Sequence, residues 1–363
     1  MSDLDLLPTE IEEDLRGSVR DLLGDRCDPA AVIAMYDGDR SLVAPLWKAL
    51  AADLGLAGLL VAEEHGGHGA TAREAAVVLE ELGRHAAPVP FLTSAVIATS
   101  VLESDSVTPA GRELLAALAS GERTAALVVP WSTGPGSPVV GRAGTVTSVA
   151  GALDADVLLV PVTTTSGLEI RAVAAERATV TPVVSLDMTR QLADVTVPVG
   201  EGEVVVADAE GAVRDALELG AALLASEQVG AARWCLDTTL AYVKVRRQFG
   251  RVVGGFQAIK HRLADLYTGV ESATAAARYA AVAHAVADPD APVSTAVAQA
   301  FCSDLAVLAA EEAVQLHGGI GMTWEHPAHV YLKRAKADQV ALGTPGRHRA
   351  RLATLVDLPG VGG

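Results

Sequence analysis

The first third of the chain has the apolar spacing of helices. Over residues 10–120, side chains such as Leu46, Leu50 and Leu54 recur every three or four positions, which predicts amphipathic helices. Thr71 followed by Glu74 forms the sequence signature of a capping box, so we expect a helix to begin there. We therefore predict an N-terminal helical domain over residues 1–120.

The middle third has a different pattern of short β-branched runs divided by Gly, Pro, Ser and Asp. Such runs predict short strands, and prolines at their ends are tolerated at the edge of a sheet. The runs are Thr124–Pro130, Val139–Val140, Thr145–Val149, Val157–Val162, Leu168–Val173 and Val195–Val199. A small β-sandwich or barrel over residues 121–208 is the expected structure.

Helical spacing returns at about residue 209 and continues to the end. The stretch Asp215–Val245 predicts one long helix, and four more candidates follow at roughly 257–287, 292–316, 327–341 and 344–356. Long helices with short connections predict an antiparallel bundle over 209–363. The expected fold class is therefore α+β, with helices, then a β domain, then a helical bundle.

Composition excludes several classes of protein. The chain has 363 residues, a net charge of −17 and 50% hydrophobic residues, which argues against disorder and against nucleic-acid binding. No uninterrupted apolar run of 18 residues predicts a membrane span, and the acidic N-terminus does not resemble a secretory signal. The three cysteines Cys27, Cys235 and Cys302 are widely spaced, so we expect a reducing, cytoplasmic environment.

The positive charges are unevenly distributed. The stretches Arg233–Arg262 and Lys333–Arg351 contain 13 of the 28 Lys and Arg residues and only one acid each, Asp237 and Asp338. On an acidic protein such stretches are candidate anion sites, and solvated helix faces are an equally good interpretation.

Three glycine-containing segments near helix ends could carry chemistry. Arg246–Gly250 follows the long helix, and arginine there suits both a helix C-terminus and a phosphate. Gln315–Gly321 ends a second helix, and Thr344 is a good N-cap for the last one. Taken alone, a segment such as Gln315–Gly321 is more often a C-cap than a cofactor loop, and Thr344 could be an ordinary N-cap. The histidines of the chain are scattered in the sequence, so no metal site is predicted.

Together these segments resemble the acyl-CoA dehydrogenase family. Residues 246–273, RRQFGRVVGGFQAIKHRLADLYTGVESA, are similar to its RxxFG…FQ…LADM segment. Residues 311–336, EEAVQLHGGIGMTWEHPAHVYLKRAK, resemble its QxxGGxG segment. Residues 46–84 resemble the segment of its N-terminal domain that ends in an EelGr sequence.

The resemblance implies a helical domain, a β domain and a four-helix bundle. It implies FAD-dependent α,β-desaturation of acyl-CoA thioesters: a glutamate removes the α-proton, the β-hydrogen leaves as hydride to the flavin, and an electron-transfer flavoprotein accepts the electrons. In the family, FAD crosses a subunit interface, and the second subunit's RxxFG and QxxGG segments hold its pyrophosphate and adenosine.

The chain departs from the family where the flavin ring and the base should be. Leu342 occupies the usual base position, and Gly220 occupies the alternative position in the long helix; neither residue can accept a proton. Glu218 and Glu227 are the nearest acids in the sequence, and we expect both to be solvated helix residues. Trp131 is the only aromatic residue of 121–208, so the usual flavin platform is not evident.

We therefore predict a non-catalytic subunit that completes the FAD site of a second acyl-CoA dehydrogenase-like chain in an α2β2 assembly, acting in lipid metabolism on bulky or steroid-derived CoA esters. Two alternatives are a self-sufficient homo-oligomeric dehydrogenase with a relocated base and a flavin-free acyl-CoA-binding or scaffold protein. The residues expected to bind FAD are Arg246, Gln248, Phe249, Phe256, Gln257, Gln315, Gly318, Gly319 and Thr344.

Overall fold

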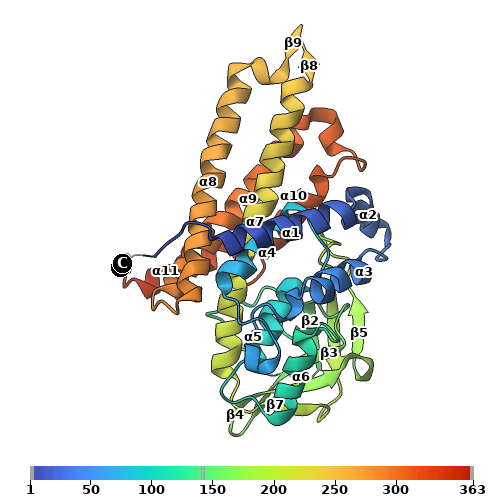
Figure 1. Cartoon of the computed structure of the whole chain (residues 1–363), viewed down its shortest axis with the longest axis vertical. Helices are drawn as coiled ribbons and strands as arrows, with labels where there is room; N and C mark the ends of the chain where they lie inside the picture. The colour runs from blue at the N-terminus through green and yellow to red at the C-terminus, as the bar shows by residue number, and fades with distance from the viewer. Residues whose placement is uncertain (1–3, 140, 142–143, 360–363) are drawn as a thin grey trace.

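A computed structural model describes residues 4–139, 141 and 144–359 (Figure 1). The predicted helical character of the N-terminal third is confirmed. Its helices are α1 (Glu10–Arg26), α2 (Pro29–Ala34), α3 (Val43–Lys48), α4 (Ala72–Arg84), α5 (Thr99–Leu102) and α6 (Pro109–Ala119), with a π-helical segment, η5 (Phe91–Ala98), before α5. The predicted capping box is also confirmed, because the Thr71 side chain accepts from the Arg73 N–H while the Glu74 carboxylate accepts from the Thr71 N–H.

The central region consists of two small sheets that face each other, so of the two predicted forms it is the sandwich. Strands β1 (Ala125–Leu127), β3 (Val157–Thr164), β4 (Gly167–Ala174) and β7 (Glu203–Val206) form one sheet in that order, with β1 parallel to β3. Strands β2 (Gly144–Ala150), β6 (Leu192–Val197) and β5 (Thr179–Pro182) form the other. Buried side chains such as Val128, Leu158 and Val195 fill the space between them.

The sequence pattern missed strands β5 and β7. Strand β5 is short and mostly exposed, whereas β7 contains the β-branched run Val204–Val206, which the sequence analysis did not single out. Val139 is not in a strand, and Val140 lies outside the described residues.

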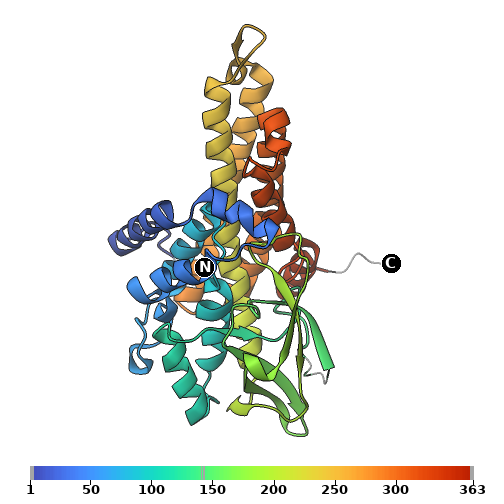
Figure 2. The same ribbon diagram turned by 90° about the vertical axis from the view of Figure 1, so that its right-hand side faces the viewer.

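The C-terminal region is a bundle built around α7 (Glu210–Val245), a helix of 36 residues that is about 54 Å long and runs through both halves of the molecule (Figures 1 and 2). Helices α8 (Gln257–Ala285) and α9 (Ala291–His317) run beside it, and the shorter α10 (Ala328–Asp338) and α11 (Pro345–Leu355) complete the bundle. A short hairpin of β8 (Arg247–Gln248) and β9 (Arg251–Val252) projects beyond the end of α7.

Two glycines let α4 and α7 cross closely. A Cβ added to Gly83 would lie 2.0 Å from the carbonyl oxygen of Glu227, and one added to Gly230 would lie 1.9 Å from that of Glu80. Only glycine permits this backbone contact. The N-terminal domain and the bundle therefore share one continuous core instead of packing as separate bodies.

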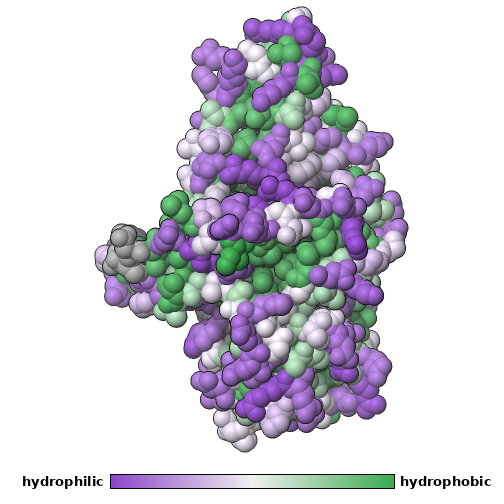
Figure 3. All heavy atoms as spheres, viewed as in Figure 1, coloured by the Kyte–Doolittle hydropathy of each residue, from purple (hydrophilic) through white to green (hydrophobic). Residues whose placement is uncertain are grey.

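Helix α9 is the most apolar long helix. By length and composition, the stretch Ala291–Met322 could cross a membrane, but 72% of its apolar window is buried inside the protein. It packs against α7, α8, α10 and α11, which is the position of a central bundle helix. The face of the molecule in Figure 3 mixes hydrophilic and hydrophobic residues.

Candidate functional site

The Arg246–Gly250 segment forms the turn of the exposed β8–β9 hairpin. Phe249 and Gly250 have φ angles of 52° and 78°. Positive φ at both central positions is the backbone of a type I′ turn, which usually carries Asn-Gly. A phenylalanine there is strained, and its side chain is 90% exposed. Strain of this kind gathers at binding sites, where another group stabilises the turn.

Cations around this hairpin have no internal partner among the described carboxylates. Arg233 and Arg262 pair with Glu271 and Glu312, but these lie further down the helices. Lys244, Arg246, Arg247 and Lys260 are exposed and form no ion pair with a described residue, and Arg251 stacks on the Phe256 ring at 3.8 Å. The end of the bundle therefore presents free positive charge on a protein of net charge −17.

The Gln315–Gly321 segment lies at the same end. Helix α9 ends at His317, and Gly318 turns the chain with a φ of 64°. Gln315, Gly318 and Gly319 are exposed, and a Cβ at either glycine would meet no atom within 4 Å. Open backbone of this kind can approach a ligand closely.

The structure thus brings eight of the nine predicted FAD residues to one end of the bundle and leaves Thr344 elsewhere. Thr344 caps α11, as predicted, by accepting from the Arg347 N–H. Helix α11 packs near Ala300, because Arg349 donates to the Ala300 carbonyl. Ala300 and Gly318 are separated by 18 helical residues, or about 27 Å. Thr344 and the hairpin therefore cannot contact the same small group.

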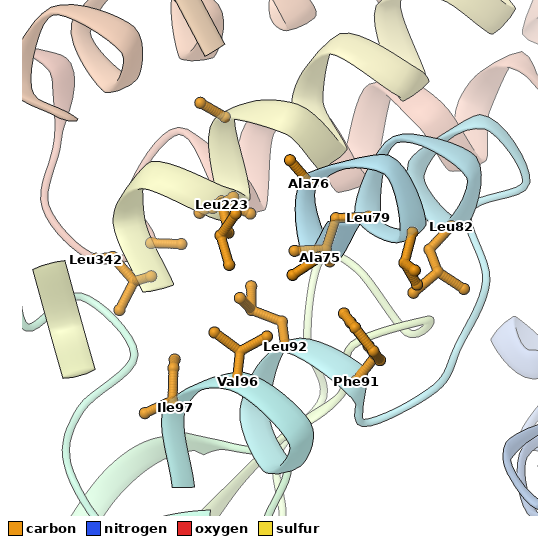
Figure 4. Close-up of a cluster of buried hydrophobic side chains, with 14 of the residues drawn as sticks. Ala75, Ala76, Leu79, Leu82, Phe91, Leu92, Val96, Ile97, Leu223 and Leu342 are labelled. Carbon is orange, nitrogen blue, oxygen red and sulfur yellow. The ribbon is translucent and has the colours of Figure 1, made fainter. Parts of the chain in front are cut away.

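The position that the family resemblance assigns to the base lies in an apolar core (Figure 4). The Leu342 side chain is 1% exposed and belongs to the same cluster as Ile97 and Leu223. A Cβ added to Gly220 would lie 2.8 Å from Ile97 Cγ1 and 3.4 Å from Leu342 Cδ1. The two candidate base positions therefore meet at one point in space, and neither provides a carboxylate or room for one.

The crevice between the β domain and the bundle is closed beside Leu342. The Leu342 N–H donates to the Trp131 carbonyl at 2.8 Å, and a Cβ added to Gly134 would lie 3.0 Å from the Leu342 oxygen. The cavity that remains between Trp131, Leu217 and Leu342 has room for about one water molecule. A flavin ring therefore does not fit here.

A buried ion cluster lies on the other side of Trp131. The Arg190 guanidinium stands over the Trp131 ring at 5.5 Å and bridges Glu227 (2.6 Å) and Asp338 (2.5 Å). Arg334 bonds the same Glu227 carboxylate. Glu227 is 1% exposed, so the prediction that it is solvated was wrong.

Burial and pairing act in opposite directions on these carboxyls. Burial opposes the ionisation of Glu227, but Arg190 and Arg334 outweigh it and hold its pKa below the ordinary value. For Asp338, burial dominates over the charge of Arg190 and raises the pKa to about 7. Three buried acids (Asp187, Glu227 and Asp338) thus face two arginines. Sequence analysis missed this cluster because its members are far apart in the chain.

Glu218 was also predicted incorrectly as solvated. Its side chain is 8% exposed and its carboxylate is bound by both terminal nitrogens of Arg351. Most of the positive charge of the second cation-rich stretch is neutralised in this way, by internal ion pairs of Arg334, Lys336, Arg349 and Arg351. This stretch is therefore not an open anion site, unlike the hairpin.

The histidines expected to be scattered are partly gathered. His317 and His326 have ring centroids 4.3 Å apart, and His329 lies against Trp324 at 4.8 Å. No group of three potential ligands in the described part of the chain could hold a metal ion.

Family models match both helical parts of the chain: residues 9–122 match the acyl-CoA dehydrogenase N-terminal domain, and residues 211–356 match the acyl-CoA dehydrogenase C-terminal domain. The chain belongs to the acyl-CoA dehydrogenase family. This finding confirms the predicted family and its fold of N-terminal helices, central sheets and C-terminal helices. Members of this family are flavoprotein oxidoreductases.

Relatives with known names support the same assignment. The chain is 36% identical to the acyl-CoA dehydrogenase IpdE2 of Mycobacterium tuberculosis over 351 residues, which cover 97% of this chain and 99% of that protein. Among solved structures, it is similar to a chain of the ChsE4–ChsE5 complex from Mycobacterium tuberculosis, with a TM-score of 0.85, 26% identity and coverage of 99% and 100%. It is also similar to a chain of the Tcur3481–Tcur3483 steroid ACAD, with a TM-score of 0.84, 27% identity and coverage of 96% and 98%.

Proposed function

We propose that this chain is the non-catalytic subunit of a flavin-dependent acyl-CoA dehydrogenase and completes the FAD site of a second acyl-CoA dehydrogenase-like chain. One contrast carries the proposal. The chain's own ring site and base position are closed and apolar around Leu342, whereas its nucleotide-binding segments are exposed and cationic around Arg246.

The residues at the hairpin fit the phosphate and adenosine half of FAD. Arg246 can bind a pyrophosphate through two parallel hydrogen bonds, and the exposed Phe249 offers an aromatic face for a heterocycle. The open backbone at Gly318 and Gly319 allows close approach. Bound FAD would supply the hydride acceptor, while this chain's residues would hold and orient its nucleotide end. No catalytic step is assigned to this chain.

The assembly and the substrate are part of the same proposal. One structural relative is described as a complex of two named chains, ChsE4 and ChsE5, and another as a steroid ACAD. These names support a complex of two acyl-CoA dehydrogenase-like chains that acts on a steroid-derived substrate. We propose that the assembly is α2β2, acts on bulky CoA esters in the cytoplasm and passes its electrons to an electron-transfer flavoprotein.

A self-sufficient dehydrogenase would need a relocated base. Glu218 and Glu227 are the candidates closest to Gly220 in the sequence, and each is held in a buried ion pair with arginine. A carboxylate paired in this way is a poor proton acceptor. This alternative is therefore less well supported. A flavin-free scaffold protein would leave the unpaired cations at the hairpin unexplained.

Flavin content per chain tests the proposal. The chain is expressed alone and together with an acyl-CoA dehydrogenase-like partner chain from the same genome, and FAD absorbance is measured after purification. We expect little FAD in the isolated chain and about half an equivalent per chain in the complex, since one FAD serves each heterodimer. A full equivalent of FAD in the isolated chain, with dehydrogenation of an acyl-CoA, would contradict the proposal.

A matched pair of variants of the complex gives the control. Arg246→Ala should lower the FAD content strongly because Arg246 is an unpaired cation at the hairpin. Arg233→Ala, on the same helix but paired with Glu271, should leave it unchanged. Equal FAD content in both variants and in the unchanged complex would argue for the flavin-free alternative.

A further inference from the structure

An aromatic stack joins the two segments that are proposed to bind the nucleotide. Tyr242 lies in the last turn of α7, and His317 is the last residue of α9. Their ring centroids are 4.5 Å apart and the ring planes differ by 28°. The two residues are 75 positions apart in the chain, so the contact is a product of the bundle and not of local sequence.

Tyr242 is linked directly to the arginine turn. Its carbonyl oxygen accepts a hydrogen bond from the Arg246 N–H at 2.9 Å, and the Arg246 carbonyl accepts from the Val253 N–H at 2.8 Å. Both ends of the hairpin backbone are therefore hydrogen-bonded to Arg246 or through it to Tyr242. Any rotation of the Tyr242 turn moves Arg246 with it, because only four residues of helical backbone separate them.

His317 is linked just as directly to the glycine turn. The ring is 3% exposed, and its Nδ1 lies 2.7 Å from the Ala313 carbonyl, which makes Nδ1 the protonated nitrogen. Gly318 follows immediately. A Cβ added to Gly321 would lie 2.9 Å from His317 Cβ, so the turn Gly318–Met322 folds back over this residue.

A second ring also packs against the histidine. The ring centroids of His326 and His317 are 4.3 Å apart, with the ring planes inclined by 47°, and the His326 Nδ1 accepts from the Ala328 N–H. His317 is therefore closely packed and almost completely buried. Gly318 alone can terminate α9, so the helix end does not need a buried histidine at this position. The hydrogen bond at Nδ1 and the stack on Tyr242 therefore call for another explanation.

We infer that Tyr242 and His317 form a positioning pair, whose stacked rings fix the Arg246 turn relative to the Gly318–Gly319 turn so that both act as one nucleotide-binding surface. Neither residue is proposed to touch the reacting atoms. The inference rests on the proposed function for its ligand, but the mechanical coupling it asserts belongs to this chain alone.

Amide hydrogen exchange on the isolated full-length chain tests the coupling without a partner. His317→Ala should speed exchange in the hairpin at Arg246 and Val253, although the mutated residue lies on another helix. Tyr242→Ala should speed exchange at Thr323, whose N–H donates to the Ile320 carbonyl. Exchange that rises only beside each mutated residue would overturn the inference.

Conservative variants separate positioning from general stability. Tyr242→Phe and His317→Phe keep a stacked ring and should restore slow exchange at the remote turn. Trp234→Ala removes another stack of α7, against Tyr331 at 3.7 Å, and should leave both turns unchanged. Equal loosening by Trp234→Ala and His317→Ala would show a general loss of stability and would contradict a positioning role.

FAD binding by the complex with the partner chain gives the functional result. His317→Ala should weaken FAD binding roughly three- to tenfold, as expected for the loss of one aromatic pair, and His317→Phe should recover most of it. If Arg246→Ala abolishes FAD binding but His317→Ala does not weaken it, the positioning pair is wrong and the proposed function stands. If neither variant changes FAD binding, the proposed function itself fails, while the exchange result still decides the coupling.

Discussion

At the scale of single residues, the side chains that face inward between the domains are the most informative. Leu342 has a φ angle of 50°, an uncommon conformation for leucine, and its backbone bonds both Trp131 and His348. Two hydrogen bonds thus stabilise the strained backbone of Leu342, while its apolar side chain can neither donate nor accept a proton. Asp338 is the residue whose environment makes the clearest prediction about pH.

The pKa of Asp338 is raised by burial from 3.8 to about 7 in the folded protein. A carboxyl whose folded pKa lies above its unfolded pKa binds more protons when folded, so its contribution to stability falls as pH rises from about 4 to about 7. Arg190, Arg334, Glu227 and Asp187 are the charged groups that face it.

Asp338→Asn should therefore flatten the decline in the free energy of unfolding between pH 5 and pH 7.5, by on the order of 2 kcal/mol. Urea unfolding at a series of pH values measures this. Asp237→Asn, at an exposed ion pair with Arg84, is the control and should keep the slope of the unchanged protein. An unaltered slope in Asp338→Asn would show that Asp338 titrates normally.

At the scale of elements, the crossing of α4 and α7 fixes how the N-terminal domain meets the bundle. Its two glycines bring the backbones together, and α7 then carries the same alignment to the hairpin at the far end. The remaining helices pack through apolar contacts, with alanine in many of the buried positions, and α10 and α11 also reach α7 through the ion pairs Arg334–Glu227 and Arg351–Glu218.

Gly230→Ala should destabilise the protein by about 2–3 kcal/mol or more, because a Cβ at this position would lie 1.9 Å from the Glu80 carbonyl oxygen and must separate the helices. Gly17→Ala in α1 is the matched control, since a Cβ at Gly17 meets nothing within 4 Å. That variant should be neutral or up to about 1 kcal/mol more stable. Similar midpoints of urea unfolding for the two variants would refute the close crossing.

At the scale of the whole molecule, the β domain is attached to the bundle through a charged junction and not only through apolar contacts. Arg190 comes from the loop between β5 and β6, and its carboxylate partners come from α7 and α10. Removing one member of a buried ion pair leaves an uncompensated buried charge. The resulting loss of stability is larger than the net stability that the intact pair contributes.

Arg190→Met should therefore destabilise the protein by about 3–5 kcal/mol. Amide exchange should rise first in the sheet residues 144–197, before it rises in α8 and α9. Arg84→Met, which breaks the exposed pair with Asp237, should change stability by less than about 1 kcal/mol. A loss of stability in Arg190→Met spread evenly over the chain would show that the arginine does not act at this junction.

The sequence alone determined the types of element, their order and the family, because apolar spacing, capping residues and glycine positions are local properties. It also singled out the Arg246 and Gly318 segments, which the fold then placed together. Strand β5 was missed because it is short and mostly exposed, and β7 was missed although it carries the run Val204–Val206. What only the tertiary structure decided is which charges are neutralised. Arg190 and Asp338 are 148 residues apart and Arg351 and Glu218 are 133 apart, so no local pattern shows that these pairs are buried while the cations around Arg246 remain free. The same long-range packing brings Leu342 against Gly220 and Trp131, closing the place where a flavin ring would have to fit.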